Sequence, residues 1–102
     1  MMFLFLDDLR ESPADAVCCR TAEEALRWLA TGQVTHISFD HDLGTELTGY
    51  DVANRIEQWV AEGRIPMPSW AVHSANPVGR RNIEAAMRSA ERFSKTAGAK
   101  AC

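Results

Sequence analysis

Three clusters of polar residues each come at the end of a short apolar run. They are Asp7-Asp8 after MFLFL, Asp40-His41-Asp42 after THISF, and His73-Ser74 at the end of SWAVHS. Carboxylates supply the hard oxygen ligands that Mg²⁺ prefers, and histidine transfers protons near neutral pH. Brought together, such residues could bind a cation and move protons. Kept apart, each cluster would be only a solvated turn.

The elements that must position these clusters follow from the apolar pattern. Four apolar runs, at residues 2–6, 16–20, 35–39 and 69–73, predict strands. Three apolar stripes at helical spacing predict helices: Ala22, Ala25, Leu26 and Leu29; Val52, Ile56, Trp59 and Val60; and Ile83, Ala86, Met87 and Ala90. Thr21 with Glu24 forms a capping box, and Asn76 followed by Pro77 is a helix start.

Strands that alternate with helices predict a mostly parallel sheet covered by helices. Only LRESPAD separates the first two strands, which is short for a parallel crossover, so an extended loop or a turn of helix is expected there. In an open parallel sheet, ligands bind beyond the carboxyl ends of the strands. All three polar clusters are therefore expected at one edge, and this convergence favours a site over three separate turns.

A divalent-cation site is expected at Asp7, Asp8 and Asp40, because clustered carboxylates repel one another unless a cation or proton intervenes. Mg²⁺ or Mn²⁺ would fill it. His41 and His73 are candidates for proton transfer, with hydrogen-bonded support as an equal alternative.

An anion site is expected at the start of the last helix, where free backbone N–H groups and the helix dipole favour a phosphate. Its candidate residues are Ser74, Asn76, Gly79 and Arg80, joined by Arg10 from the first cluster. Two exposed arginines without a ligand are the alternative for Arg80 and its neighbour Arg81.

Length and charge limit the protein class. The 102 residues fit one domain, expected at 1–94, with a flexible tail at 95–102. A net charge of −3 argues against an extended nucleic-acid surface. The apolar N-terminal run of six residues is too short for a signal peptide or a membrane span. Three cysteines without CxxC spacing favour a reducing cytoplasm.

The motifs FLDDLR, FDHDLG, TGYDV and VHSANPVG, taken in order, resemble the cyclic-phosphate processing receiver domains, a divergent group of response-regulator receivers. In this resemblance Asp7-Asp8 matches the metal-binding acidic pair and Asp40 the phosphoacceptor aspartate. Gly49-Tyr50 matches the glycine and aromatic residue that follow the metal loop, and Ser74-Ala75 matches the hydroxyl residue and alanine at the end of the fourth strand. The resemblance covers about residues 2–93.

The resemblance implies a small flavodoxin-like, receiver-like α/β domain with three layers and a four-stranded sheet in the order 2-1-3-4. The first helix would be reduced, and the fifth strand, with its lysine, and the fifth helix would be missing. It also implies action on cyclic phosphates in RNA repair or nucleotide signalling.

The function expected on both grounds is a metal-dependent phosphoesterase that opens a cyclic phosphate, on an RNA end or a cyclic nucleotide. Asp40 would serve as metal ligand or as nucleophile. A non-catalytic switch module, which senses a phosphate ligand or binds a partner protein, is the alternative. A small protein inhibitor is a third.

Overall fold

Strands and helices alternate as predicted after the first two strands. The structure is a computed structural model that describes the backbone of residues 2–101 and the side chains of residues 2–94. Its elements are β1 (Met2–Leu6), β2 (Val17–Cys19), α1 (Ala22–Leu29), β3 (Val34–Phe39), α2 (Gly49–Ala61), β4 (Ser69–Val72) and α3 (Pro77–Ala101).

The sheet has the predicted order β2-β1-β3-β4, and all of its strand pairs are parallel. β1 and β3 form its centre, with Leu6 opposite Phe39. The backbone N–H of Asp40 donates to the carbonyl of Leu6 at 2.9 Å, which continues the ladder one residue past the strand. The carboxyl ends of β1 and β3 therefore lie side by side, and the receiver-like fold class is confirmed.

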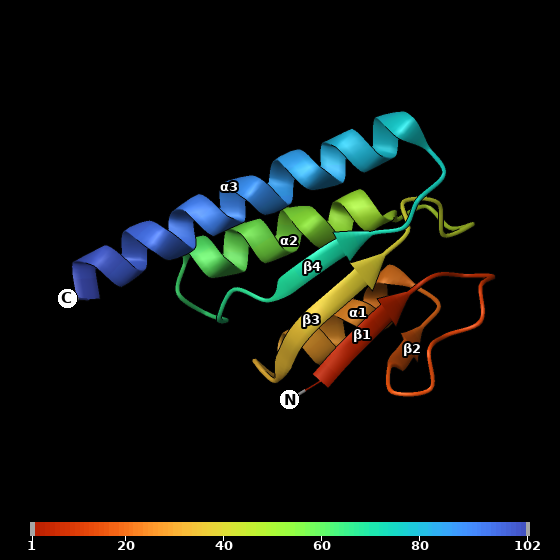
Figure 1. Ribbon diagram of the computed structural model, residues 1–102, viewed down its shortest axis with the longest axis horizontal. Coiled ribbons are helices and arrows are strands. Elements are labelled where there is room, and N and C mark those ends of the chain that lie inside the picture. Colours follow the sequence, from red (N-terminus) through yellow and green to blue (C-terminus); the bar gives the residue numbers. More distant parts are fainter. Residues whose placement is uncertain (1, 102) are drawn as a thin grey trace.

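The helices form one layer, so the described chain has two layers and not the three that were expected. The connections through α1 and α2 both move across the sheet from β2 towards β4, and right-handed crossovers place both helices on the same face. The connection from β1 to β2 moves the other way, but residues 7–16 contain no helix. Figure 1 shows α1 behind β1 and β3, with α2 and α3 continuing the same layer.

The core lies between this helix layer and the facing side of the sheet. Leu4, Leu6, Ile37 and Phe39 point towards the helices and are fully buried. They meet the predicted helix stripes, of which Val52, Ile56, Ile83 and Met87 are fully buried. This one-sided core is what holds the strand ends in register.

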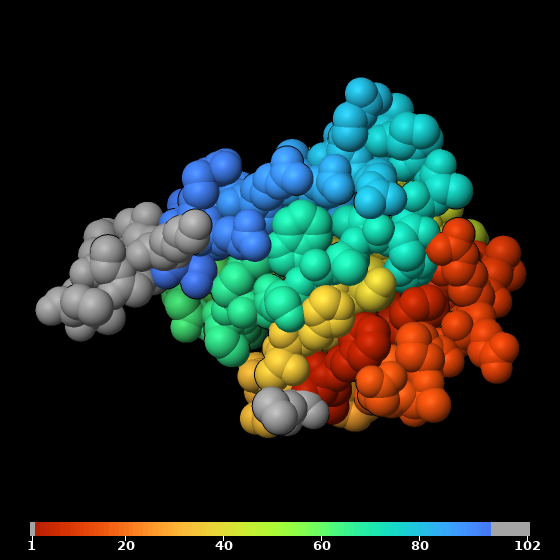
Figure 2. Space-filling model, viewed as in Figure 1, coloured from red at the N-terminus to blue at the C-terminus, as the bar shows by residue number. Residues whose placement is uncertain are grey.

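The opposite side of the sheet, called here the uncovered face, carries alternate residues of the same strands. They are Phe3, Phe5, Cys18, His36, Ser38, Ser69, Ala71 and His73. Figure 2 looks onto this face and shows β1, β3 and β4 at the surface without a helix across them. Hydroxyl, imidazole and aromatic groups replace the aliphatic side chains usual on a buried sheet face.

The helix ends follow the sequence signals. The side chain of Thr21 accepts the N–H of Glu24, and that of Asn76 accepts the N–H of Gly79, as predicted. A third cap was not predicted: the N–H of Thr48 donates to Asp51 at 2.6 Å. No helix among the described residues is long and apolar enough to cross a membrane.

α3 extends to Ala101. The flexible tail predicted at 95–102 lies outside the part of the chain whose side chains the structure describes, and it stays a prediction, as does the domain boundary at residue 94.

The packing of α3 on the sheet can be tested at Met87, whose side chain is fully buried. Met87→Ala should lower the free energy of unfolding by about 2–5 kcal/mol, because it leaves a cavity in the one-sided core. Arg88→Ala, at the exposed neighbouring position, should change it by less than about 0.5 kcal/mol. Urea denaturation measures both, and equal effects would contradict the packing described here.

Candidate functional site

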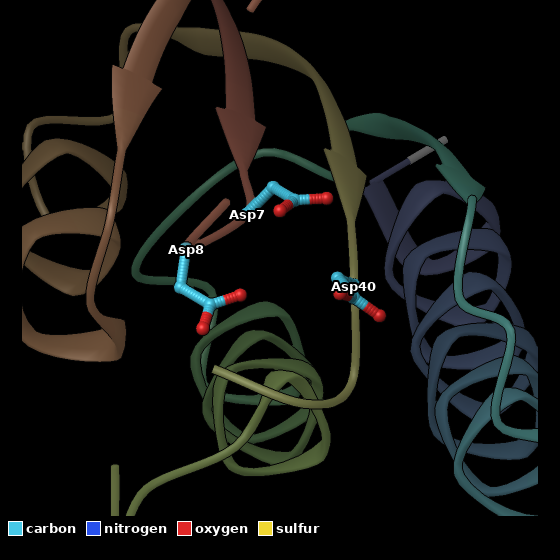
Figure 3. Close-up of side chains that lie close together, drawn as sticks. All are labelled: Asp7, Asp8 and Asp40. Carbon is cyan, nitrogen blue, oxygen red and sulfur yellow. The ribbon is translucent and has the colours of Figure 1, made fainter. Parts of the chain in front are cut away.

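Three carboxylates meet at the carboxyl edge of the sheet. Asp7 and Asp8 follow β1, and Asp40 follows β3. One oxygen from each lies within 4.8 Å of the others, and Figure 3 shows the three side chains around one space at the strand ends. The structure thus brings together the three residues that the sequence predicts as metal ligands.

Asp7 is the buried member, with only 1 % of its surface exposed. Its Oδ1 accepts the backbone N–H groups of Leu9 and Arg10 at 2.9 and 2.8 Å, and its Oδ2 lies 2.9 Å from Nε2 of His73. Burial raises the pKa of this carboxyl, but the hydrogen bonds from Arg10, Leu9 and His73 outweigh burial and hold the pKa below 3.8. A carboxylate has about four acceptor sites, so Oδ2 keeps one for a further ligand.

Asp8 and Asp40 are half-buried and face the same space. Oδ1 of Asp40 accepts the N–H of His41 at 2.8 Å, which fixes the carboxylate against its own loop. Gly44 has a φ of 68°, and a Cβ there would lie 3.0 Å from Oδ2 of Asp8. The loop after β3 therefore approaches Asp8 closely. Three carboxylates with oxygens directed to one point suit Mg²⁺ or Mn²⁺.

His41 connects the carboxylate cluster to the start of α3. Its Nδ1 lies 2.9 Å from Oδ1 of Asp42, and this hydrogen bond lowers the pKa of the Asp42 carboxyl. Its ring packs against Gly79, where an added Cβ would come within 2.6 Å of the ring carbon Cδ2. With Nδ1 held by Asp42, Nε2 is the nitrogen that can exchange a proton with a ligand.

His73 has a different environment from His41. Its Nε2 lies 2.9 Å from Asp7 and its Nδ1 2.8 Å from Oγ of Ser38. The ring is stacked on Phe5, with centroids 4.6 Å apart and planes 1° from parallel. Both ring nitrogens are occupied, so the geometry favours the second of the two roles considered for His73, hydrogen-bonded support.

The predicted phosphate-binding residues are only partly gathered. Ser74 is buried and accepts the N–H of Asn76 at 3.1 Å, while Asn76 caps Gly79 at 3.0 Å. Nη1 of Arg10 donates to the carbonyl of His73 at 2.6 Å. Arg80 pairs with Glu84 one turn along α3 at 3.5 Å and is not drawn into the cluster.

Two contributors were missed by sequence reasoning. Nη1 of Arg20 donates to the carbonyls of Asp7 and Arg10, at 2.9 and 2.7 Å, and so closes the turn after β1. Ser38 contacts His73 from the uncovered face. The alternation of β3 could have placed Ser38 on the same side as His36. The reach of Arg20 across the turn has no signal in the sequence.

Two hollows lie away from this cluster. One, of about 230 Å³, lies between α2 and α3, and the other, of about 340 Å³, lies along α1. Their linings are Tyr50, Asn54, Glu57, Asn82, Ala85 and Ala86 for the first, and Glu24, Arg27, Trp28 and Thr31 for the second. Neither contacts the three aspartates.

A parallel sheet in the order 2-1-3-4 with carboxylates at the ends of its two central strands defines a receiver-like α/β domain. Residues 2–89 match the model of a family described as the cyclic-phosphate processing receiver domain. The chain belongs to this family, and the resemblance noted in its motifs is confirmed. No curated protein and no solved structure matches the chain.

The close approach of α2 to the loop after β3 can be tested at Gly49. A Cβ there would lie 2.9 Å from the carbonyl carbon of Asp40 and closer still to its oxygen. Since backbone cannot move aside cheaply, Gly49→Ala should cost about 3 kcal/mol or more in unfolding free energy. Gly63→Ala should cost about 1–2 kcal/mol, because that position has a positive φ but open space around it. Chemical denaturation measures both. A smaller loss of unfolding free energy in Gly49→Ala than in Gly63→Ala would contradict the close approach.

Proposed function

We propose that this protein is a metal-dependent phosphoesterase that opens a cyclic phosphate. The observation that carries the proposal is the cluster of three carboxylate oxygens within 4.8 Å in a member of the cyclic-phosphate processing receiver family. Carboxylates this close repel one another when ionised, and a bound cation would relieve that repulsion.

The residues that would hold the cation are Asp7, Asp8 and Asp40. Bound there, Mg²⁺ or Mn²⁺ would neutralise the charge that develops on the phosphoryl oxygens. Asp7 is already fixed by three hydrogen bonds, and Asp40 by one. Little reorganisation of these carboxylates is therefore needed when a ligand arrives.

His41 is the residue assigned to proton transfer. Asp42 holds Nδ1, so Nε2 accepts a proton from the attacking water. The P–O bond to water forms as the P–O bond of the ring breaks, and a solvent water protonates the oxygen that leaves phosphorus. The product is a phosphate monoester or an opened diester.

The start of α3 is assigned to the phosphate oxygens. The His41 ring packs on Gly79, so the positive end of the helix lies beside the residue that moves the proton. The side chain of Arg10 is half exposed and lies 3.8 Å from Asp7, which puts a positive charge at the same edge.

A binding or switch module is the second candidate. It is favoured by one observation: both nitrogens of His73 are occupied, so only one of the two histidines remains to transfer protons. Such a module would bind the cyclic phosphate without turnover.

The metal site can be tested by thermal unfolding with millimolar Mg²⁺ or Mn²⁺. A site filled at about a hundred times its dissociation constant adds about 2.7 kcal/mol, so the melting temperature should rise. Asp8→Asn, which removes a half-buried ligand, should abolish most of the rise. Glu62→Gln, at the far end of α2, should keep it. An unchanged melting temperature in the parent protein would overturn the metal site.

Turnover can be tested with 2′,3′-cyclic mononucleotides, RNA that ends in a cyclic phosphate, and cyclic dinucleotides. His41→Asn should lower the rate about 10²–10⁴-fold, because it removes the titratable nitrogen but keeps a polar side chain of similar size. His36→Asn is the matched control, since His36 lies on the uncovered face and contacts Ser69. Tight binding without any turnover in the parent protein would favour the switch module. Full activity in His41→Asn would remove His41 from the mechanism.

A further inference from the structure

A chain of hydrogen bonds runs across the uncovered face into the carboxylate cluster. Oγ of Ser38 lies 2.8 Å from Nδ1 of His73, and Nε2 of the same ring lies 2.9 Å from Oδ2 of Asp7. Ser38 is the next-to-last residue of β3, and His73 and Asp7 directly follow β4 and β1. They form a continuous connection between the uncovered face and the carboxylate edge.

The direction of these bonds follows from the chemistry of the groups. An ionised carboxylate only accepts hydrogen bonds, so Nε2 must carry the hydrogen that it donates to Asp7. In the neutral ring Nδ1 then has a lone pair, which accepts the hydroxyl hydrogen of Ser38. Ser38 thus favours the one tautomer of His73 that can donate to Asp7.

The remaining contacts of His73 fix the ring but not its tautomer. The N–H of His73 donates to the carbonyl of Phe39 at 3.2 Å, and its carbonyl accepts Arg10. The Phe5 ring stacks on the imidazole from one side. Among these contacts, the hydroxyl of Ser38 is the group that bonds to Nδ1 of His73.

Ser38 is not placed to act as a nucleophile. It lies inside β3, paired with Phe5 on one side and Ala71 on the other, so the backbone around it is committed to the sheet. Acyl transfer by a serine needs free N–H donors for the oxyanion, and a strand paired on both sides offers none. Its hydroxyl acts through the imidazole instead.

A second serine–histidine pair on the same face provides a comparison. Oγ of Ser69 lies 2.8 Å from Nδ1 of His36, the same distance as in the Ser38 pair. The His36 ring packs edge-on against Phe3, with centroids 4.9 Å apart. The hydroxyl of Ser69 also donates to the carbonyl of Thr35 at 3.1 Å, and its histidine does not contact the three aspartates. The pair is therefore a serine–histidine contact without the connection to the cluster.

We propose that Ser38 and His73 are positioning residues that hold Asp7 in the orientation needed to bind the cation, an inference that rests on the proposed metal site. Asp7 and Ser38 together favour the tautomer of His73 that carries hydrogen on Nε2, and His73 in turn holds Oδ2 of Asp7. A direct partner of a metal ligand, as His73 is of Asp7, typically changes metal affinity 10–100-fold when it is removed. Ser38 lies one contact further out, so its removal should have an effect at the low end of that range.

The test compares Mn²⁺ affinity, measured by electron paramagnetic resonance, in the parent protein and its variants. Ser38→Ala should weaken binding about 10-fold, the low end of the range for partners of a metal ligand. Ser38→Thr keeps the hydroxyl and should restore most of the affinity. Ser69→Ala removes the matched hydroxyl and should bind like the parent. If Ser38→Ala fails to fold, Ser38→Cys replaces it, because a thiol is a weak donor of similar size.

A metal-free measurement tests the tautomer directly. The ¹⁵N shifts of the His73 ring should show hydrogen on Nε2 in the parent and in Ser69→Ala, and a mixture of tautomers in Ser38→Ala. Parent-like affinity and shifts in Ser38→Ala would overturn the positioning role while leaving the metal site intact. A parent protein that binds no Mn²⁺ would overturn the metal site, and the positioning role with it.

Discussion

The edge of this sheet is organised by the need to satisfy one buried carboxylate. An ionised group removed from water is tolerated only when hydrogen bonds replace its hydration, and those that Asp7 receives come from different parts of the chain. The turn after β1 supplies two N–H groups, and the end of β4 supplies the His73 ring. The main chain of Asp7 also donates to the carbonyl of Cys19 and accepts Arg20. Satisfying this carboxylate therefore joins the ends of β1 and β4, and the main chain of the same residue adds the end of β2.

The loop after β3 completes the edge in a different way. Glycines in α2 and α3, which have no side chain, let the helices approach this loop closely. α2 begins at Gly49 against the backbone of Asp40, and α3 contains Gly79 against the ring of His41. The N–H of Gly49 also donates to the carbonyl of His41 at 2.9 Å. The two glycines bring two helix starts to the residues that follow β3. The hydrogen bonds of Asp7 and the close contacts at the two glycines together place the three aspartates and His41 at one edge.

The sequence was sufficient for the helix stripes and the three aspartates, because these depend on periodicity and on the rule that parallel strands end at one edge. The strand order came from the resemblance of its motifs to the receiver family. It was misleading for the layers. The run MFLFL reads as a strand buried on both sides, yet Phe3 and Phe5 lie on the uncovered face and only alternate residues are buried. The environment of His73 depends on Ser38, a residue 35 positions away, and no local pattern encodes such a contact. The ion pair of Arg80 with Glu84 could have been predicted, since residues four positions apart on a helix are neighbours.

The two-layer architecture has a consequence for how this domain can vary. On the helix side of the sheet, each side chain fills volume shared with two or more elements, and a substitution is felt through the whole core. On the uncovered face, Ser38 and His36 contact solvent and one or two neighbours, and their identity is limited by hydrogen bonding more than by size. Adjacent positions along one strand are thus constrained in alternation, by packing on the helix side and by hydrogen bonding on the uncovered face. The hydrogen-bonded groups behind the carboxylates can therefore be exchanged with little disturbance of the core.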